Sequence, residues 1–133
     1  MDESSPPSDQ GKMWAILSYV GLIFWLPLGA IPMIMRDDAY ALHHGKSATA
    51  VWLGALITSI ALSVVITLIS VVTCGLGSLL YVFLFLPGLW LLVTGIHGLI
   101  LTLNAKWDEP IGVFGLGDRF FANVKTKDAL PGP

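Results

Sequence analysis

The residues best suited to chemistry lie in one polar segment, residues 36–50, with the sequence RDDAYALHHGKSATA. Its candidate site residues are Asp37, Asp38, Tyr40, His43, His44, Gly45 and Lys46. Adjacent histidines suggest a metal site, but on a helix neighbouring side chains diverge by about 100°. Asp37 would lie about 10.5 Å along the helix axis from His44. A metal ion needs its ligands within about 2.0–2.2 Å, so we expect no metal site here.

Catalysis is not expected from this segment either. A hydrolase needs a nucleophile, a base and an orienting acid that converge, and the serines of this chain lie in apolar segments or tails without a motif around them. Lys46 and Arg36 suit anionic lipid headgroups. We therefore predict a non-enzymatic protein in which residues 36–50 set membrane depth and docking.

His97 is the second candidate for chemistry, because it is the only His, Asp, Glu, Lys or Arg between Ser47 and Ala105. An ionisable side chain at membrane depth could be an axial ligand of haem or chlorophyll, or part of a proton path. His97 lies about two helical turns from the end of its apolar segment, where a neutral imidazole bonded to a neighbouring helix costs little. We favour that structural role and predict no cofactor.

Long apolar segments must position these residues. The chain is 55% hydrophobic and 12% charged, with its charges in short clusters. A membrane-spanning helix needs about 20 apolar residues, and the apolar segments are too continuous for barrel strands. We predict an all-α integral membrane domain at residues 12–105, with three spans at about 13–35, 51–73 and 79–103. The net charge of −2 argues against a nucleic-acid partner.

The remaining segments are assigned from their helix-breaking residues and from their polarity. Residues 1–11 are rich in Ser, Pro and acidic residues and are predicted to be a disordered tail. The first span contains Pro27 and Pro32, so it is expected to kink or break near Trp25–Gly29, or to be re-entrant. Residues 36–50 suit a short interfacial helix. A second kink is expected at Pro87–Gly88. Residues 106–133 are predicted to form an amphipathic, interfacial tail.

Small residues predict where helices pack. The second span has a stripe spaced four apart, and glycines recur along the third: Ala55, Ser59, Ser63, Thr67, Gly88 and Gly95. Within lipid, helix association depends on close approach and on hydroxyl hydrogen bonds, which such residues permit. The alternative is that the hydroxyl groups bond only to carbonyl groups of their own helix.

The distribution of Lys and Arg predicts orientation. With three spans, Lys12 is the only cation on the side of the N-terminus and Cys74, and the other six lie on the side of residues 36–50 and the C-terminus. The positive-inside rule then places those residues in the cytoplasm and the N-terminus opposite, in a bacterial inner membrane or one derived from it. A re-entrant first segment would return the N-terminus to the cytoplasm.

A family resemblance agrees with this description. A proline-broken first span is followed by Asp37–Asp38, an aromatic residue, and His44-Gly45-Lys46-x-Ala48 running into a span. This pattern resembles the small Tic-type membrane proteins: the twenty-kilodalton subunit of the chloroplast inner-envelope import translocon, uncharacterised bacterial relatives and magnetosome membrane proteins. Ser47 stands where that family usually has Gln or Glu. The resemblance implies a helical membrane protein that acts through other membrane proteins, without known catalysis.

The function predicted from the sequence is that of an accessory, assembly or scaffold subunit of a larger membrane complex. Its partners would be membrane lipids and other integral membrane subunits. One alternative is a translocation or small channel component formed by self-association as a homo-oligomer. Another is a pigment- or haem-binding subunit that uses His97.

Overall fold

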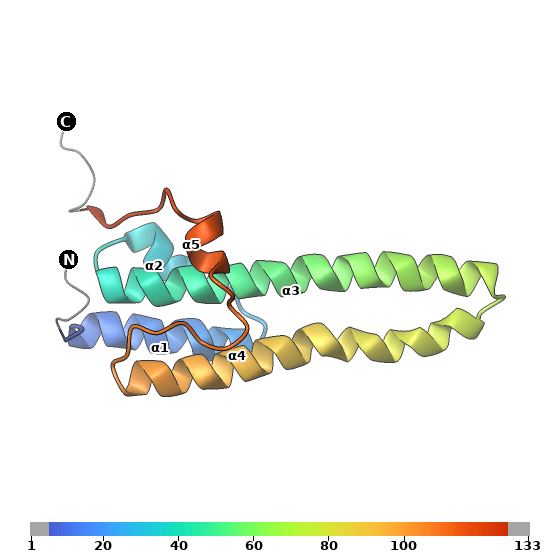
Figure 1. The fold of residues 1–133 in the computed structure, drawn as a ribbon, viewed down its shortest axis with the longest axis horizontal. Helices are drawn as coiled ribbons and strands as arrows, with labels where there is room; N and C mark the ends of the chain where they lie inside the picture. The colour runs from blue at the N-terminus through green and yellow to red at the C-terminus, as the bar shows by residue number, and fades with distance from the viewer. Residues whose placement is uncertain (1–5, 128–133) are drawn as a thin grey trace.

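The fold is a long helical hairpin with shorter helices packed around one end (Figure 1). The structure is a computed structural model and describes residues 6–127, in which every regular element is a helix. The elements are α1 (Asp9–Ile23), α2 (Ala30–Met35), α3 (Ala39–Val72), the 3₁₀ helix η1 (Leu76–Leu84), α4 (Phe85–Leu103) and α5 (Leu116–Phe120). The predicted all-helical fold is therefore confirmed for these residues.

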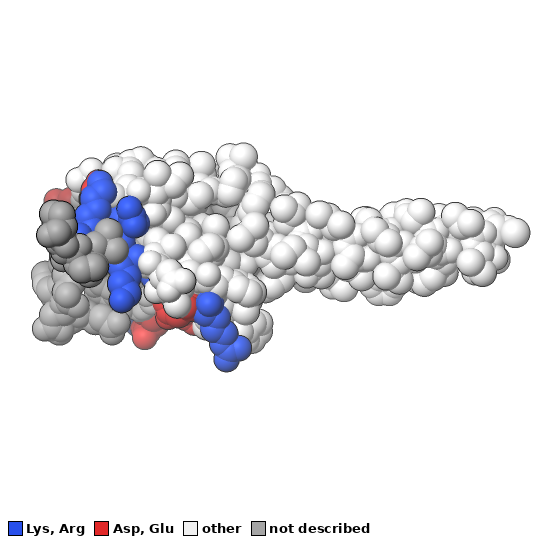
Figure 2. All heavy atoms as spheres, turned by 90° about the horizontal axis from the view of Figure 1, so that it is seen from above, with Lys and Arg blue, Asp and Glu red and all other residues white. Residues whose placement is uncertain are grey.

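The molecule has two parts. We call residues 6–52 and 90–127, which contain α1, α2, α5 and the adjoining ends of α3 and α4, the head. We call residues 53–89, which form the far part of α3 and the η1–α4 segment beside it, the hairpin. Figure 2 shows Lys, Arg, Asp and Glu side chains on the head, and none on the visible face of the narrow hairpin. Two helical segments, Ala39–Val72 and Leu76–Leu103, are long and apolar enough to cross a membrane.

The third predicted span is not present as a single helix. α1 ends at Ile23, and the chain turns through residues 24–29 before α2. The Ser8 hydroxyl at the start of α1 donates to Asp38 at 2.7 Å, whereas Trp25 beyond its end accepts at its carbonyl from Trp52 Nε1 at 3.0 Å. α1 therefore runs parallel to α3, and α2 returns to the start of α3. The predicted break is present, and the chain reverses direction within residues 13–35, as the re-entrant alternative requires.

This path corrects the predicted position of the N-terminal segment. The start of α1 lies at the same end of the molecule as the start of α3 and the end of α4, and not at the end where α3 turns into η1 (Figure 1). The predicted tail is shorter as well, because residues 9–11 belong to α1 and Ser8 caps it by accepting from the Gly11 amide at 3.0 Å. Residues 1–5 and 128–133 of the two predicted tails lie outside the described residues.

Residues 39–50 do not form a separate interfacial helix but are the first turns of α3. Asp38 caps this helix, since its Oδ1 accepts from the Ala41 amide at 2.9 Å. α1, α2 and α5 all pack on α3, so this polar part of the helix is buried on several sides.

The hairpin turn lies in the gap between the predicted spans at 51–73 and 79–103, at Cys74 and Gly75, which have φ of 53° and 96°. The returning arm begins as the 3₁₀ helix η1 and continues as α4 from Phe85. Pro87 is the third residue of α4, a position whose N–H has no partner within an α-helix, so the proline is accommodated there. The predicted kink at Pro87–Gly88 is replaced by this junction of two helix types.

The core lies between α1, α3, α4 and the loop before α5. It contains Tyr19, Leu22, Ala48, Val51, Ala55, Leu91 and Val113. Glycines of α4 let α1 approach closely: a Cβ on Gly95 would lie 3.0 Å from Ile23, and one on Gly98 would overlap the Tyr19 ring. The glycine side of α4 thus packs against α1 of the same chain.

Candidate functional site: the His44 cluster

The best-defined polar arrangement is centred on His44, which is fully buried in α3. Its Nδ1 lies 2.8 Å from the hydroxyl of Tyr19 in α1, and its Nε2 lies 2.8 Å from the carbonyl oxygen of Lys106, just after α4. The Tyr40 hydroxyl donates to the same carbonyl at 2.9 Å. We call Tyr19, Tyr40, His44 and the Lys106 carbonyl the His44 cluster.

The partners determine where the protons lie. A carbonyl oxygen only accepts, so Nε2 of His44 carries a proton and donates to Lys106. In the neutral imidazole Nδ1 then accepts, and the Tyr19 hydroxyl is its donor. Burial raises the pKa of Tyr19 well above its usual value, and the nearby Tyr40 and Glu109 raise this pKa further, so the phenol keeps its proton.

Aromatic rings pack edge to face around this cluster. The centroids of Tyr40 and His44 are 4.6 Å apart at an interplanar angle of 66°, and those of Tyr40 and Trp107 are 5.1 Å apart at 85°. His43, the other predicted histidine, is half-buried beside this cluster, and its ring lies 5.8 Å from that of Trp107 at an interplanar angle of 42°. Such pairs contribute about 0.5–1.5 kcal/mol each beyond their buried area.

The chemistry available to the cluster is limited by its own hydrogen bonds. Both ring nitrogens of His44 are occupied, so this imidazole has no free lone pair for a metal or for a substrate proton. What the cluster does is join α1, α3 and the segment after α4 in one network. We interpret it as a structural clasp of the head.

The other predicted residues of segment 36–50 are divided among separate contacts. Asp38 caps α3 and accepts from Ser8, and exposed Asp37 forms an ion pair with Lys127 at 2.7 Å. Gly45 packs against α2, where an added Cβ would lie 2.7 Å from Pro32. Lys46 is half-buried beside α5, because Gly117 of α5 fits against the backbone of Lys46 and Ser47.

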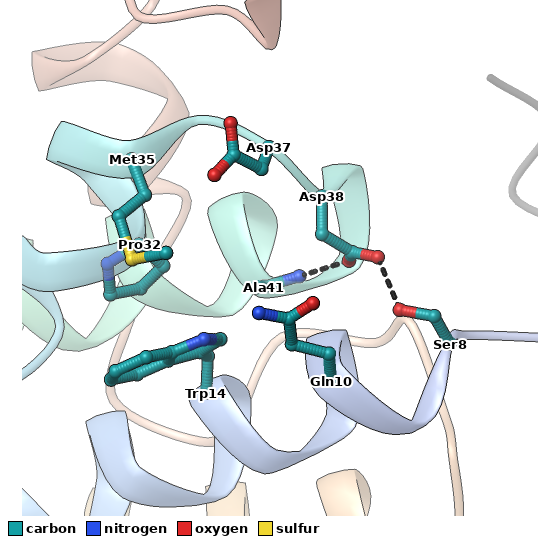
Figure 3. Close-up of a pocket in the computed structure, with 8 residues that line it drawn as sticks. All are labelled: Ser8, Gln10, Trp14, Pro32, Met35, Asp37, Asp38 and Ala41. Atoms are coloured by element: carbon teal, nitrogen blue, oxygen red, sulfur yellow. Dashed lines mark hydrogen bonds between the residues drawn. The ribbon is translucent and has the colours of Figure 1, made fainter.

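Asp37 and Asp38 also line a pocket of about 190 Å³ at the outer end of the head (Figure 3). The other lining residues come from α1, α2 and α3, and they are Ser8, Gln10, Trp14, Pro32, Met35 and Ala41. Both carboxylates already have partners within the chain. The pocket therefore offers an apolar wall, one exposed carboxylate and one half-buried carboxylate, and its polar groups do not converge on one point.

His97 is part of a second network, which fixes the loop of residues 104–115 on α4. Its Nδ1 accepts from the Ile111 amide at 2.9 Å, Thr94 donates to the Ile111 carbonyl at 2.9 Å, and Trp90 Nε1 donates to the Gly112 carbonyl at 2.9 Å. Because Nδ1 accepts, the proton of the neutral ring lies on Nε2, which then has no lone pair for a haem iron or chlorophyll magnesium. His97 therefore fits a structural role.

The small residues of the α3 stripe become less buried along the helix. Ala55 is buried in the core, Ser59 and Ser63 are half-buried, and Thr67 is exposed. The Thr67 hydroxyl lies 2.7 Å from the Ser63 carbonyl and 2.6 Å from the Tyr81 hydroxyl of η1. Thr67 thus bonds back to its own helix and also faces the other arm of the hairpin.

Sequence reasoning missed Tyr19, Thr94, Trp90 and Trp107 as site residues. Tyr19 had one signal, a hydroxyl in the middle of an apolar segment, but its partner 25 residues later is set by the tertiary path. The Lys106 carbonyl is a backbone group, so the identity of residue 106 does not predict that this carbonyl accepts from Tyr40 and His44.

Comparisons of this chain with family models, with curated proteins and with solved structures return no match.

Proposed function

We propose that this chain is a non-enzymatic integral membrane protein, anchored by its hairpin, that serves as an accessory or assembly subunit of a larger membrane complex. The observation that carries the proposal is the surface of the hairpin. Most of its large apolar side chains are exposed, including Ile57, Leu68, Val72, Leu79 and Val82 at 62–82%. Water does not tolerate a continuous apolar surface of this kind, whereas lipid and partner helices do.

The hairpin also offers a surface suited to another helix. Ser63 and Thr67 line a shallow groove with Val64 and Leu68. Small hydroxyl side chains let a neighbouring backbone approach closely in a membrane. We place the helix of a partner subunit in this groove.

The His44 cluster supports the non-enzymatic part of the proposal. Its buried polar groups are paired with one another, which suits a rigid head more than a reacting site. A rigid head on a two-helix anchor is suited to docking at a membrane surface.

Charge supports an orientation for the anchor. All seven Lys and Arg residues of the chain lie in the head, and the turn at residues 73–75 has none. By the positive-inside rule the head, including the start of α1, lies in the cytoplasm and Cys74 lies on the opposite side. We propose a bacterial inner membrane, or a membrane derived from it, as the location. Membership of the Tic-type group is a proposal that the sequence resemblance supports.

Gentle detergent extraction of a tagged copy at native level, with native-gel sizing and mass spectrometry, tests the subunit role. We expect a discrete complex with other integral proteins. Ser63→Leu fills the groove and keeps the helix apolar, so it should abolish co-migration. Val65→Leu, a comparable change at an exposed position two residues along α3, should not. A ladder of self-oligomers without a partner would contradict the subunit role and favour the channel alternative.

A further inference from the structure

We propose that the hydrocarbon core of the bilayer begins at the junction of head and hairpin. The head would then lie among the lipid headgroups of one leaflet and touch the hydrocarbon with the tips of two turns, residues 24–26 and 111–114. This inference rests on the proposed hairpin anchor, and it replaces a first membrane span with an interfacial head.

Three tryptophans mark the junction. The Trp25 carbonyl accepts from Trp52 Nε1 at 3.0 Å, which ties the turn after α1 to the level of Trp52 in α3. Trp90 Nε1 donates to the Gly112 carbonyl at 2.9 Å, and its ring lies against Gly54. Both turns therefore reach the same depth along α3. Tryptophan is enriched at membrane–water interfaces, where its ring is apolar and its N–H is polar.

The two turns present apolar side chains outward. Phe24 and Leu26 are 69% and 50% exposed, and Ile111 and Phe114 are 65% and 75% exposed. Turns of soluble proteins usually carry polar residues at such positions. Side chains of this kind, at the level where the apolar hairpin begins, fit the edge of a lipid hydrocarbon phase.

The backbone at these turns supports the same reading. Trp25 and Phe114 have φ of 61° and 53°, a left-handed conformation that favours glycine and is strained for aromatic residues. Strained residues cluster at functional positions, where the side chain is needed in spite of the conformation. Contact of these two rings with lipid gives a reason for aromatic residues here.

The loop of residues 104–115 limits how far the hydrocarbon can reach. This loop has no regular helix, and irregular backbone exposed to lipid does not occur within the hydrocarbon core. Asp118 and Arg119 are exposed on α5, which packs beside Lys46 and Ser47. A bilayer that covered α1 along its whole length would enclose these charges and this backbone.

The length of the hairpin sets the other limit. From Leu53 to Val72, α3 rises about 30 Å, which matches a hydrocarbon core of about 30 Å. Moving the bilayer toward the head by half this length would put the far part of the hairpin in water. The far part of the hairpin has highly exposed apolar side chains on both α3 and η1, among them Leu68, Val71, Val72, Leu76 and Leu79. Outside the two turns, the head has fewer large apolar side chains that are more than half exposed, and these are Ile34, Ile100, Leu103 and Phe120.

Site-directed spin labelling tests this depth. In a Cys74→Ser background, single cysteines at Val64, Ile111 and Met13 would carry a nitroxide in vesicles of phosphatidylethanolamine and phosphatidylglycerol. The measurement is the collision rate of each label with oxygen, which concentrates in hydrocarbon, and with a water-soluble nickel chelate. Leu26→Cys samples the other turn, residues 24–26, independently, in case the Ile111→Cys variant does not fold.

We expect oxygen to dominate at Val64, the two rates to be comparable at Ile111 and Leu26, and nickel to dominate at Met13. Dominance of oxygen at Met13 as well as at Val64 would overturn the inference and leave the hairpin anchor intact. Dominance of nickel at Ile111 and Leu26 would show that the turns do not reach lipid, and would also overturn it. Dominance of nickel at Val64 would contradict the proposed anchor itself.

Discussion

The hydroxyl of Tyr19 lies 2.8 Å from Nδ1 of His44, and this contact joins α1 to the first turns of α3. The other ring nitrogen of His44 reaches the backbone carbonyl of Lys106 at 2.8 Å. One imidazole thus connects three segments that are distant in sequence. The stability of the head should depend on this ring more than on any neighbouring polar side chain.

His44→Ala should destabilise the head by about 1–3 kcal/mol, because it leaves the buried Tyr19 hydroxyl without its acceptor and the Lys106 carbonyl without one of its two donors. Tyr19→Phe, which removes one hydrogen bond, should cost about 1 kcal/mol. Unfolding of the detergent-solubilised protein by SDS, followed by tryptophan fluorescence, measures both. His43→Ala is the matched control, since His43 Nε2 has no hydrogen-bond partner among residues 6–127. Equal losses at His43 and His44 would contradict the clasp.

Gly98→Ala should destabilise the packing of α1 on α4 by about 1–3 kcal/mol, because the new methyl group would overlap the Tyr19 ring. Gly88→Ala lies on the same helix and meets Trp25 only at 3.6 Å or more, an ordinary contact. It should be nearly neutral. The same SDS titration compares the two, and a larger loss at Gly88 would show that α1 does not sit on α4 as described.

Gly112→Ala should release the loop of residues 104–115 from α4. Gly112 has φ of 94°, and a Cβ there would lie 2.6 Å from Thr94 Oγ1 and 2.7 Å from Trp90 Nε1. Hydrogen exchange at the Ile111 amide, which bonds to His97, should become faster. Gly115→Ala has similar backbone strain, with φ of 70°, but open space around the new methyl group, and should leave that amide protected. Unchanged exchange in Gly112→Ala would contradict the anchoring network.

Much of the fold follows from sequence physics. The charge-free segment from Ser47 to Ala105 predicts two long helices, and Cys74 and Gly75 predict the turn between them. Pro27 and Pro32 predict a break in the first apolar segment. Hydropathy measures the length and polarity of a segment but not its path, so it did not show that residues 13–35 reverse direction. That reversal depends on tertiary contacts such as Trp52 Nε1 with the Trp25 carbonyl.

The candidate site was harder to predict for a similar reason. A helical wheel places Tyr40, His43, Ser47 and Val51 on one face with His44 at its edge. All of them are buried except His43, which is half-buried. The wheel also places Leu42 on the opposite, outer face, yet Leu42 is buried too, because helices of the head pack on α3 from more than one side. Periodicity reports one preferred face and not the number of neighbours around a helix.

The most direct test of the two-span account is the sidedness of three cysteines in intact cells. Cys74 is the only native cysteine and is exposed at the hairpin turn. In a Cys74→Ser background, Pro6→Cys reports the start of α1, and Ala122→Cys reports the segment after α5. A membrane-impermeant maleimide should modify Cys74 from outside, and should modify the two introduced cysteines only after permeabilisation. Modification of Pro6→Cys from outside would mean that the first apolar segment crosses the membrane, and would contradict this account.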